Sequence, residues 1–313
     1  MNTLLEAETI EKRYRLGGGR VLQAVAGVSL RVGAGEALAL VGESGCGKST
    51  LGRALLGLTP IDAGAIRFEG QDIARLSARQ MRPVRARMQM VFQDSYASLN
   101  PRRNAGEALA EPLRIHKRAG VTERVSELLD WVGLPQSALA RYPHEFSGGQ
   151  RQRLNIARAI ALDPVLLVAD EPVSALDVSV QAQIINLFRE LQERLGLACV
   201  FISHDLAVVR QMADRIAVMY LGVIVEEGDG LAVMAAPAHP YTRALLDAVP
   251  RPDRPLPPPL VGDVPSPISP PPGCRFHTRC PIAQARCRDE VPLLRDIGAG
   301  RRVACHFPLA NVV

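Results

Sequence analysis

Aromatic residues are scarce, since Phe, Trp and Tyr make up 4% of the 313 residues and Trp occurs once. A surface that stacks successive bases of a single-stranded nucleic acid depends on such rings, so this class of partner is disfavoured. No run of about 18 apolar residues exists either, and no segment is expected to cross a bilayer. The first residues carry Glu6, Glu8 and Glu11 in place of an apolar signal core, so we expect a cytoplasmic chain.

Charge of one sign is not in large excess, because 37 basic and 32 acidic residues leave a net charge of +5. This modest excess does not by itself indicate a nucleic acid as partner. The chain is 47% hydrophobic and 22% charged, which is the profile of a folded globular protein and excludes a disordered tail protein. Its length suits one large domain or about two of ordinary size.

Residues 1 to about 245 alternate short β-rich runs with helical patterns, which favours an α/β fold. The longest apolar run, Ile216–Val225, has ten residues and suits a buried pair of strands. Apolar runs of strand length predict strands that are buried on both faces. The candidates are Ala37–Val41, Val165–Ala169, Ala198–Ile202 and Ile216–Met219.

Helices are predicted where apolar residues recur every three or four positions. One such stripe, over 51–58, directly follows a glycine-rich turn. A second is expected behind Thr122 as N-cap and stops at Gly133. A third, over 184–195, is closed by Gly196.

A phosphate-binding pattern lies between the first predicted inner strand and the first of these helices. It matches G-x-x-x-x-G-K-[ST] in the strand–loop–helix setting that the motif requires. Glycines let the backbone turn so tightly that its N–H groups converge on phosphate oxygens, and the following helix adds its positive end. Lys48 would bridge the β- and γ-phosphates, and the Ser49 hydroxyl would bind Mg²⁺. The residues of the pattern are Gly42, Glu43, Ser44, Gly45, Cys46, Gly47, Lys48 and Ser49.

Two further predicted inner strands end in polar residues, and ligands of parallel α/β sheets bind at such strand ends. Asp170 and Glu171 follow the run Leu166–Ala169. Asp170 suits Mg²⁺ coordination, and Glu171 is placed to polarise an attacking water as a general base. His204 follows the run Val200–Ser203. A lone histidine there is more often structural, but the motifs around it favour a functional role.

The sequence Phe146-Ser147-Gly148-Gly149-Gln150 resembles the [L/F]-S-G-G-Q signature of ABC ATPases and opens an Arg-rich helix. Further landmarks of that family occur in order. Tyr14 resembles the aromatic residue that stacks on adenine, and Gln93 the glutamine of the Q-loop. Asp177, in Ser-Ala-Leu-Asp, resembles the D-loop residue, and His204 the switch histidine.

The resemblance implies an α/β P-loop ABC ATPase core with a helical signature subdomain, and two such domains closing head to tail around two ATP molecules. Catalytic roles fall to Glu171, His204, Gln93 and Lys48, and Mg²⁺ would be held through Ser49, Gln93 and Asp170. Each site would take Lys48, Ser49, Thr50, Gln93, Asp170, Glu171 and His204 from one chain, and Ser147, Gly148, Gly149, Gln150 and Asp177 from the other.

The C-terminal part of the sequence indicates a particular branch of the ABC ATPases. Residues 238–243 and 273–281 are similar to the C-terminal extension of oligopeptide and dipeptide importer ATPases, and the length and ending resemble the F-type member. We therefore expect an ABC ATPase domain over 1–249, with a helical subdomain at about 94–162. A Pro-rich linker over 250–272 and a short Cys-rich extension over 273–313 would complete the chain.

The resemblance implies an ATPase subunit that energises peptide uptake and associates peripherally with the cytoplasmic face of the cell membrane. Its expected partners are two transmembrane permease subunits, a second ATPase subunit (a D-type sibling or a copy of itself) and an extracytoplasmic substrate-binding protein, with no nucleic acid. Alternatives are an importer for nickel or another small solute, and a soluble ABC ATPase. The basic segment from Arg75 to Arg118 would lie at the anionic leaflet beside the permeases, or form a solvated helical face.

Four of the six cysteines lie within residues 274–305, although structural disulfides are rare in a reducing compartment. Their spacing lacks the C-x-x-C pairing of structural zinc, yet four thiolates favour a soft metal or a cluster, which would supply much of the small tail's folding energy. Relatives with this pattern carry a [4Fe–4S] cluster, which implies Cys274, Cys280, Cys287 and Cys305 as its ligands. Zinc, with His277 or His306 replacing a cysteine, and unligated thiols are alternatives. Cys46 and Cys199 are expected to be packing residues.

Overall fold

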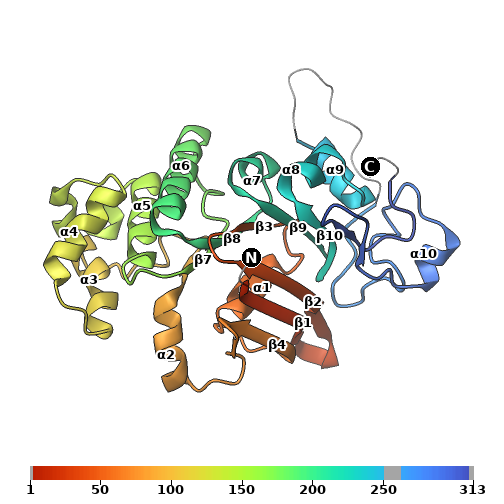
Figure 1. Ribbon diagram of the computed structural model, residues 1–313, viewed down its shortest axis with the longest axis horizontal. Helices are drawn as coiled ribbons and strands as arrows, with labels where there is room; N and C mark the ends of the chain where they lie inside the picture. Colours follow the sequence, from red (N-terminus) through yellow and green to blue (C-terminus); the bar gives the residue numbers. More distant parts are fainter. Residues whose placement is uncertain (1–2, 250–261, 310–313) are drawn as a thin grey trace. The chain divides into compact units, whose positions relative to one another are not determined.

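The structure is a computed structural model that describes residues 3–249 and 262–309 (Figure 1). The chain divides into two compact units. Unit 1 consists mainly of Arg75–Ile202, with Gly33–Glu36, and unit 2 combines Thr3–Val32, Ala37–Ala74 and the chain from Ser203 on. Most of the predicted Pro-rich linker, residues 250–261, lies outside the described residues.

Unit 1 contains a parallel sheet in the order β8-β7-β6. Its strands are β6 (Met88–Val91), β7 (Leu166–Asp170) and β8 (Ala198–Ser203). Every residue of β7 and β8 is buried, because a parallel strand is covered on both faces and its sequence is a continuous apolar run. The two strands predicted here are confirmed to within one residue at each end.

The helices of unit 1 include three that pack on one another within the predicted helical subdomain, α3, α4 and α5 (Figure 1). Their shared core contains Leu109, Leu128, Leu129 and Leu154, each fully buried. The helix bounds are α2 (Ala78–Arg87), α3 (Ala105–Ile115), α4 (Val121–Trp131), α5 (Gly148–Ala159) and α6 (Val178–Leu195), with 3₁₀ turns at Gln136–Ala140 and Pro143–Glu145.

Two predictions at helix ends were wrong. Helix α4 is capped by Gly120 and not by Thr122, because Gly120 takes a left-handed conformation (φ 66°) that turns the chain into the helix early. The stripe that begins at Leu51 ends before Leu58, which is 44% exposed. Gly57 (φ 61°) turns the chain away ahead of it. The predicted stops at Gly133 and Gly196 are confirmed, since both glycines follow a helix with positive φ, where glycine carries no steric penalty.

Unit 2 contains strands of two sheets. One sheet has the order β2-β1-β4-β5, and in the other the strands of unit 2 run β11-β12-β10-β9-β3. Strands β3 and β9 are parallel, and β9, β10, β12 and β11 follow as antiparallel neighbours. The bounds are β1 (Thr3–Arg15), β2 (Val21–Gly33), β3 (Ala37–Val41), β4 (Ala63–Phe68), β5 (Gln71–Asp72), β9 (Arg215–Tyr220), β10 (Val223–Asp229), β11 (Arg295–Asp296) and β12 (Arg302–Val303). The predicted strand pair over 216–225 is confirmed as β9 and β10.

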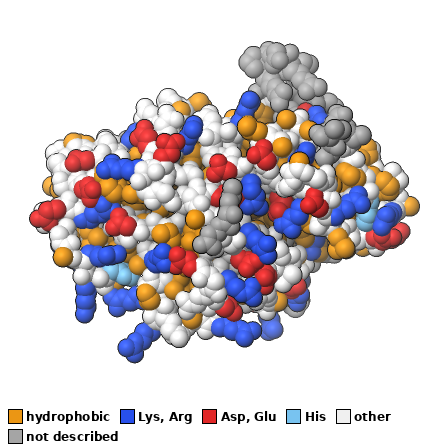
Figure 2. Space-filling view, in the orientation of Figure 1, with side chains coloured by type: hydrophobic (Ala, Val, Ile, Leu, Met, Phe, Trp, Pro, Cys, Tyr) orange, Lys and Arg blue, Asp and Glu red, His pale blue; other side chains and the backbone are white. Residues whose placement is uncertain are grey.

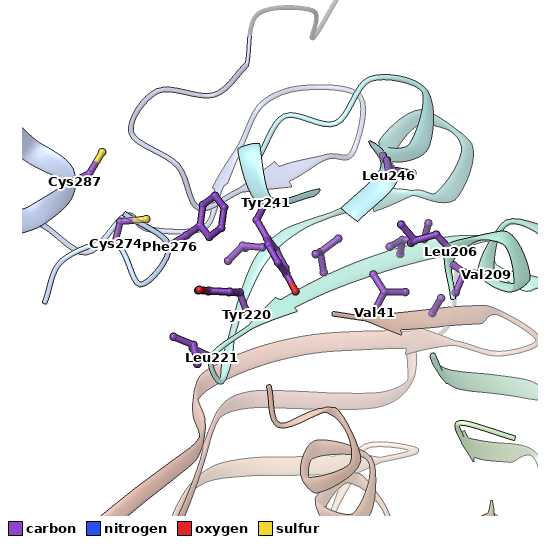
Figure 3. Packing of buried hydrophobic residues seen from close by; sticks show 14 residues of the cluster. Val41, Leu206, Val209, Tyr220, Leu221, Tyr241, Leu246, Cys274, Phe276 and Cys287 are labelled. Atoms are coloured by element: carbon purple, nitrogen blue, oxygen red, sulfur yellow. The ribbon is translucent and has the colours of Figure 1, made fainter. Parts of the chain in front are cut away.

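The Cys-rich extension contributes side chains to the core of unit 2. Phe276 packs against Tyr220 of β9 and Tyr241 of α9, with ring centroids 5.2 and 5.4 Å away, and Cys274 and Cys287 belong to the same buried cluster (Figure 3). The extension therefore shares an apolar core with β3, β9 and α9. The helices of this unit are α1 (Lys48–Leu55), α7 (Leu206–Met212), α8 (Gly230–Ala235), α9 (Pro240–Asp247) and α10 (Ala285–Asp289), with a 3₁₀ turn at Gly17–Gly19.

A buried ion pair also joins the extension to β10. Glu226 is fully buried, and its carboxylate accepts hydrogen bonds from the Arg301 guanidinium (2.9 Å) and from the backbone N–H groups of Ala238 (2.8 Å) and His239 (2.9 Å). The Arg301 side chain is 5% exposed. A charge that is buried this deeply is stable only while its partners are in place.

The surface is of mixed charge. Figure 2 shows basic and acidic side chains interspersed over the face in view, in keeping with the small net charge. Across residues 3–249 and 262–309, none of the helices has both the length and the apolar character needed to cross a membrane.

Replacing Arg301 by Met should lower the free energy of unfolding by about 3–5 kcal/mol, because Glu226 would remain buried without its countercharge. The exposed pair Arg286–Glu290, whose side chains are 57% and 56% exposed, provides the control, and Arg286→Ala should cost under about 1 kcal/mol. Denaturant unfolding of the purified variants measures both values. Equal losses in the two variants would contradict this account of the ion pair.

Candidate functional site

The predicted phosphate loop of unit 2 connects β3 to α1 and approaches its neighbours very closely. A Cβ atom at Gly42 would lie 2.1 Å from the carbonyl oxygen of Met219, and one at Gly47 would lie 2.0 Å from that of Ala24. Both distances are too short for any side chain. Glycine at these two positions therefore lets the loop rest directly on the backbones of β9 and β2.

Lys48 is already held inside this loop. Its ammonium donates hydrogen bonds to the carbonyl oxygens of Gly42 (2.8 Å) and Glu43 (2.9 Å), and the residue is 4% exposed. Helix α1 begins at Lys48, so Ser49 and Thr50 lie in its first turn, where backbone N–H groups point out of the helix toward a ligand. The arrangement concentrates positive charge at the predicted phosphate position.

The remaining predicted residues of the loop and of unit 2 differ in exposure. Ser44 and Gly45 are exposed, and Tyr14 on β1 is 38% exposed, with the Lys12 ammonium 5.4 Å from its ring centroid. His204 is exposed directly after β8. The tyrosine ring and the histidine are thus both accessible to a ligand.

Cys46 and Cys199 are both buried, as expected for packing residues. Burial raises the pKa of the Cys46 thiol, an effect that the nearby Lys48 ammonium partly offsets. Burial within β8 raises the pKa of Cys199 to about 12. Both side chains are therefore neutral thiols at physiological pH.

Unit 1 brings together two residues that are 78 positions apart. The side-chain amide of Gln93 donates a hydrogen bond to the Glu171 carboxylate at 2.9 Å. Asp170, the last residue of β7, is fully buried, and Glu171 adopts a left-handed conformation (φ 44°) with its N–H bonded to the carbonyl oxygen of Ile202 at 3.0 Å. Parallel pairing of β6 with β7 explains the juxtaposition, because both residues follow the carboxyl ends of their strands.

The predicted signature motif forms the N-terminus of α5. Ser147 is the N-cap, its hydroxyl accepts from the Gln150 N–H at 3.3 Å, and the Gln150 side chain accepts from the Ser147 N–H at 3.2 Å. A Cβ atom at Gly149 would lie 2.6 Å from Cγ1 of Val180 in the first turn of α6, whose N-cap is Asp177. The signature glycines therefore allow the starts of α5 and α6 to approach closely.

Sequence reasoning missed the contacts between α5 and the segment after Gln93. The Asn155 side chain donates to the carbonyl oxygen of Ser95 (3.0 Å) and accepts from the Ser98 hydroxyl (2.7 Å), and the Arg158 guanidinium donates to the Ser98 carbonyl oxygen. Asn155 is 2% exposed. A buried amide in an otherwise periodic helix was the available signal, but its partners lie 57 and 60 residues away.

The four tail cysteines line one small cavity, together with His239, His277 and His306. Burial raises the pKa of Cys274 and Cys280 and raises that of Cys305 to about 11, and the neighbouring thiols contribute in the same direction. No group of three or more His, Cys, Asp or Glu side chains among the described residues is arranged to hold a metal ion. The four cysteines therefore share one cavity, but the described residues contain no ready-made metal site.

Comparison with known proteins identifies the family. Residues 25–174 match the family described as ABC transporter, and residues 225–287 match the oligopeptide/dipeptide transporter, C-terminal region. A protein of Sinorhizobium fredii named as a probable peptide ABC transporter ATP-binding protein is 53% identical over 97% of this chain and 90% of its own length. The chain belongs to the ABC transporter family. This ABC ATPase is also 52% identical, over 97% of its length and 94% of the relative's, to a protein of Brucella abortus named as a peptide import ATP-binding protein.

Solved structures confirm the α/β P-loop fold of ABC cassettes. A dimeric, post-hydrolysis structure of the ATP-binding cassette MJ0796 bound to ADP and Pi is 29% identical, with a TM-score of 0.66 over 72% of this chain and 98% of that one. The cbiO1 protein of Clostridium perfringens, part of an ABC transporter complex, is 26% identical, with a TM-score of 0.66 over 75% and 92%. The chain is an ATPase of this family.

The cap at Ser147 should contribute to stability separately from any role in binding. Ser147→Ala should lower the free energy of unfolding by about 1 kcal/mol, because it removes the acceptor for the Gln150 N–H. Ser147→Asp should preserve stability, since aspartate is an equally good N-cap and its charge suits a helix N-terminus. Urea unfolding measures both variants, and wild-type stability of Ser147→Ala would show that the hydroxyl does not stabilise α5.

Proposed function

We propose that this ATPase energises the import of dipeptides or oligopeptides. The observation that carries the proposal is the match of residues 225–287 to the oligopeptide/dipeptide transporter C-terminal region. The names of the two relatives, which are 52–53% identical over 97% of the chain, support it. An importer of nickel or another small solute is the alternative within the family, and a soluble ABC ATPase is less well supported. Growth of a deletion strain on peptides of defined length as sole amino-acid source discriminates among these.

In the nucleotide site that we propose, Lys48 and the first-turn amides of α1 bind the phosphates and Tyr14 stacks on adenine. Ser49, Gln93 and Asp170 would hold Mg²⁺, which when bound neutralises charge that develops on the transferred phosphoryl group. Carboxylate, hydroxyl and amide oxygens are ligands that suit this ion. Glu171 would take a proton from the attacking water, and Gln93 would position its carboxylate. His204 would lie on the γ-phosphate side of the nucleotide.

We infer that the second half of each site comes from another ATPase subunit, either a copy or a sibling chain. Ser147, Gly148, Gly149 and Gln150 present the amides of a helix N-terminus, which favours a charged phosphate, and Asp177 caps the adjoining α6. The dimeric form of the related MJ0796 cassette supports this arrangement. Ser147→Asp keeps the helix cap but would place a negative charge against the γ-phosphate, so it should abolish turnover while leaving the fold intact.

The membrane partners follow from the importer assignment. We propose two transmembrane permease subunits, peripheral association with the membrane that holds them, and an extracytoplasmic substrate-binding protein. The helical subdomain at about 94–162 and the basic segment from Arg75 to Arg118 are the proposed permease-facing regions. Arg102 is exposed and available for such a contact, whereas Arg103 forms an ion pair with Glu111.

We propose that the four tail cysteines hold a [4Fe–4S] cluster. The proposal rests on one feature of the chain, namely that all four thiols line one cavity, and it stands against the finding that no group of three or more His, Cys, Asp or Glu side chains in the described residues is arranged to hold a metal ion. The donor set of four cysteines is the usual one for such clusters.

Glu171→Gln should reduce the ATPase turnover number at least about 100-fold, because general-base catalysis typically contributes 10²–10⁴-fold. Binding of ATP should persist, since the amide keeps the shape of the side chain and removes a negative charge near the phosphates. Phosphate release and equilibrium binding of a fluorescent ATP analogue measure the two effects. Turnover at the wild-type rate would refute the role of Glu171.

Anaerobically purified protein should be brown and contain about four irons per chain. Cys287→Ser should lower the iron content, whereas Cys199→Ser, which changes a buried cysteine outside the cavity, should not. Iron analysis and visible absorbance measure the outcome. A colourless wild-type protein with stoichiometric zinc would exclude the cluster.

A further inference from the structure

The C-terminal extension makes a direct ionic contact with the phosphate loop. Both terminal nitrogens of Arg279 donate to the Glu43 carboxylate, at 2.8 and 3.1 Å. The Arg279 side chain is 8% exposed and that of Glu43 is 27% exposed. A two-pronged pair of this kind restricts orientation as well as distance, and its hydrogen bonds are roughly twice as strong as neutral ones.

Glu43 is also held through its backbone. Its N–H donates to the hydroxyl of Tyr241 at 2.8 Å. Tyr241 is fully buried, its ring lies 4.6 Å from that of Tyr220, and its hydroxyl points toward the phosphate loop from α9 (Figure 3). Burial raises the pKa of Tyr241 far above its ordinary value, so the hydroxyl stays protonated at physiological pH.

Backbone hydrogen bonds hold the segment that carries Arg279 in place. The Cys274 N–H donates to the carbonyl oxygen of Cys287 at 2.8 Å, and the Arg279 N–H donates to that of Phe276 at 3.0 Å. Gly273 (φ 62°) permits this turn, because a Cβ atom there would lie 2.6 Å from the Cys287 carbonyl oxygen. Phe276 is buried in the core of unit 2.

Glu43 in turn connects to the lysine of the phosphate loop, since its carbonyl oxygen accepts from the Lys48 ammonium at 2.9 Å. A continuous set of polar contacts therefore runs from Arg279 through Glu43 to Lys48. Neither Arg279 nor Tyr241 is part of the phosphate-binding pattern. Their contacts fix the loop from outside, which reduces the ordering cost of binding a nucleotide.

We propose that Arg279 is a positioning residue for ATP binding, through which the C-terminal extension holds the phosphate loop in its binding-competent conformation. The inference rests on the proposed nucleotide site, in which the loop binds the phosphates. Arg279 acts through Glu43 and contacts no predicted catalytic group. Its loss should therefore weaken binding and leave the chemical step unchanged.

Arg279→Gln should raise the Kd and KM for ATP about tenfold, which corresponds to about 1.4 kcal/mol, and leave kcat within about twofold. Glu43→Gln should have the same effect. The double variant should be no weaker than either single variant, whereas independent effects would multiply to about 100-fold. Arg279→Lys, which keeps the charge, should restore part of the affinity. The matched control is Arg286→Gln, an exposed residue of the same extension, which should bind ATP like the wild type.

Equilibrium binding of a fluorescent ATP analogue and steady-state ATPase kinetics give the required values, with full-length protein of equal iron content and thermal stability. A wild-type Kd in Arg279→Gln, multiplying effects in the double variant, or a lower kcat at unchanged Kd would each overturn the proposal. Should Arg279→Gln fail to fold, Glu43→Gln decides, because it leaves the extension intact. Lys48→Ala separates a failure of the proposed nucleotide site from a failure of the role proposed for Arg279. If Lys48→Ala retains ATP binding, the proposed nucleotide site is wrong. If Lys48→Ala loses ATP binding while Arg279→Gln keeps it, only the role of Arg279 is wrong.

Discussion

The closeness of the phosphate loop to the backbone beneath it is the constraint on which the rest of unit 2 depends. At Gly42 and Gly47 the loop lies where a single added carbon would overlap a carbonyl oxygen of β9 or β2. The loop thus has a rigid support before any ligand arrives. Lys48 can fold back onto the loop carbonyls only because the turn is this tight. Since α1 starts at Lys48, the positive charge of the lysine and the first turn of the helix lie side by side.

The parts of the fold that depend on local chemistry were predictable from the sequence. Continuous apolar runs identified β3, β7, β8 and the β9–β10 pair, and glycines marked the ends of α4 and α6. Ser147 with Gln150 formed the helix start that the signature predicted. The errors at Thr122 and Leu58 also have a local cause, because Gly120 and Gly57 adopt left-handed conformations. In both cases a neighbouring glycine moved the helix boundary, and side-chain periodicity alone does not detect that.

The contacts that could not be predicted join polar side chains across long stretches of sequence. Arg279 and Glu43 are 236 residues apart, and Asn155 and Ser98 are 57 apart. The position of a charged residue in the sequence does not indicate which residue it pairs with, so the partner is known only from the folded chain. The expectation that a metal would supply much of the tail's folding energy did not foresee an apolar contribution from the tail to the core of unit 2. Phe276 stands among cysteines and arginines in the sequence, yet it packs against both Tyr220 and Tyr241 in the core of unit 2.

The packing of Phe276 joins the extension to the core of unit 2, which also carries the phosphate loop. Arg279 directly precedes Cys280, and the turn from Phe276 to Arg279 closely follows Cys274, whose N–H is bonded to the Cys287 carbonyl oxygen. One short backbone segment therefore serves both the cysteine-lined cavity and the phosphate loop. If thiol ligation and nucleotide binding each stabilise this segment, thermodynamic linkage requires that each strengthens the other by the same factor. The Arg279–Glu43 pair gives the phosphate loop a second support besides the glycine contacts, and under the proposed function this is the route by which the extension would affect the nucleotide.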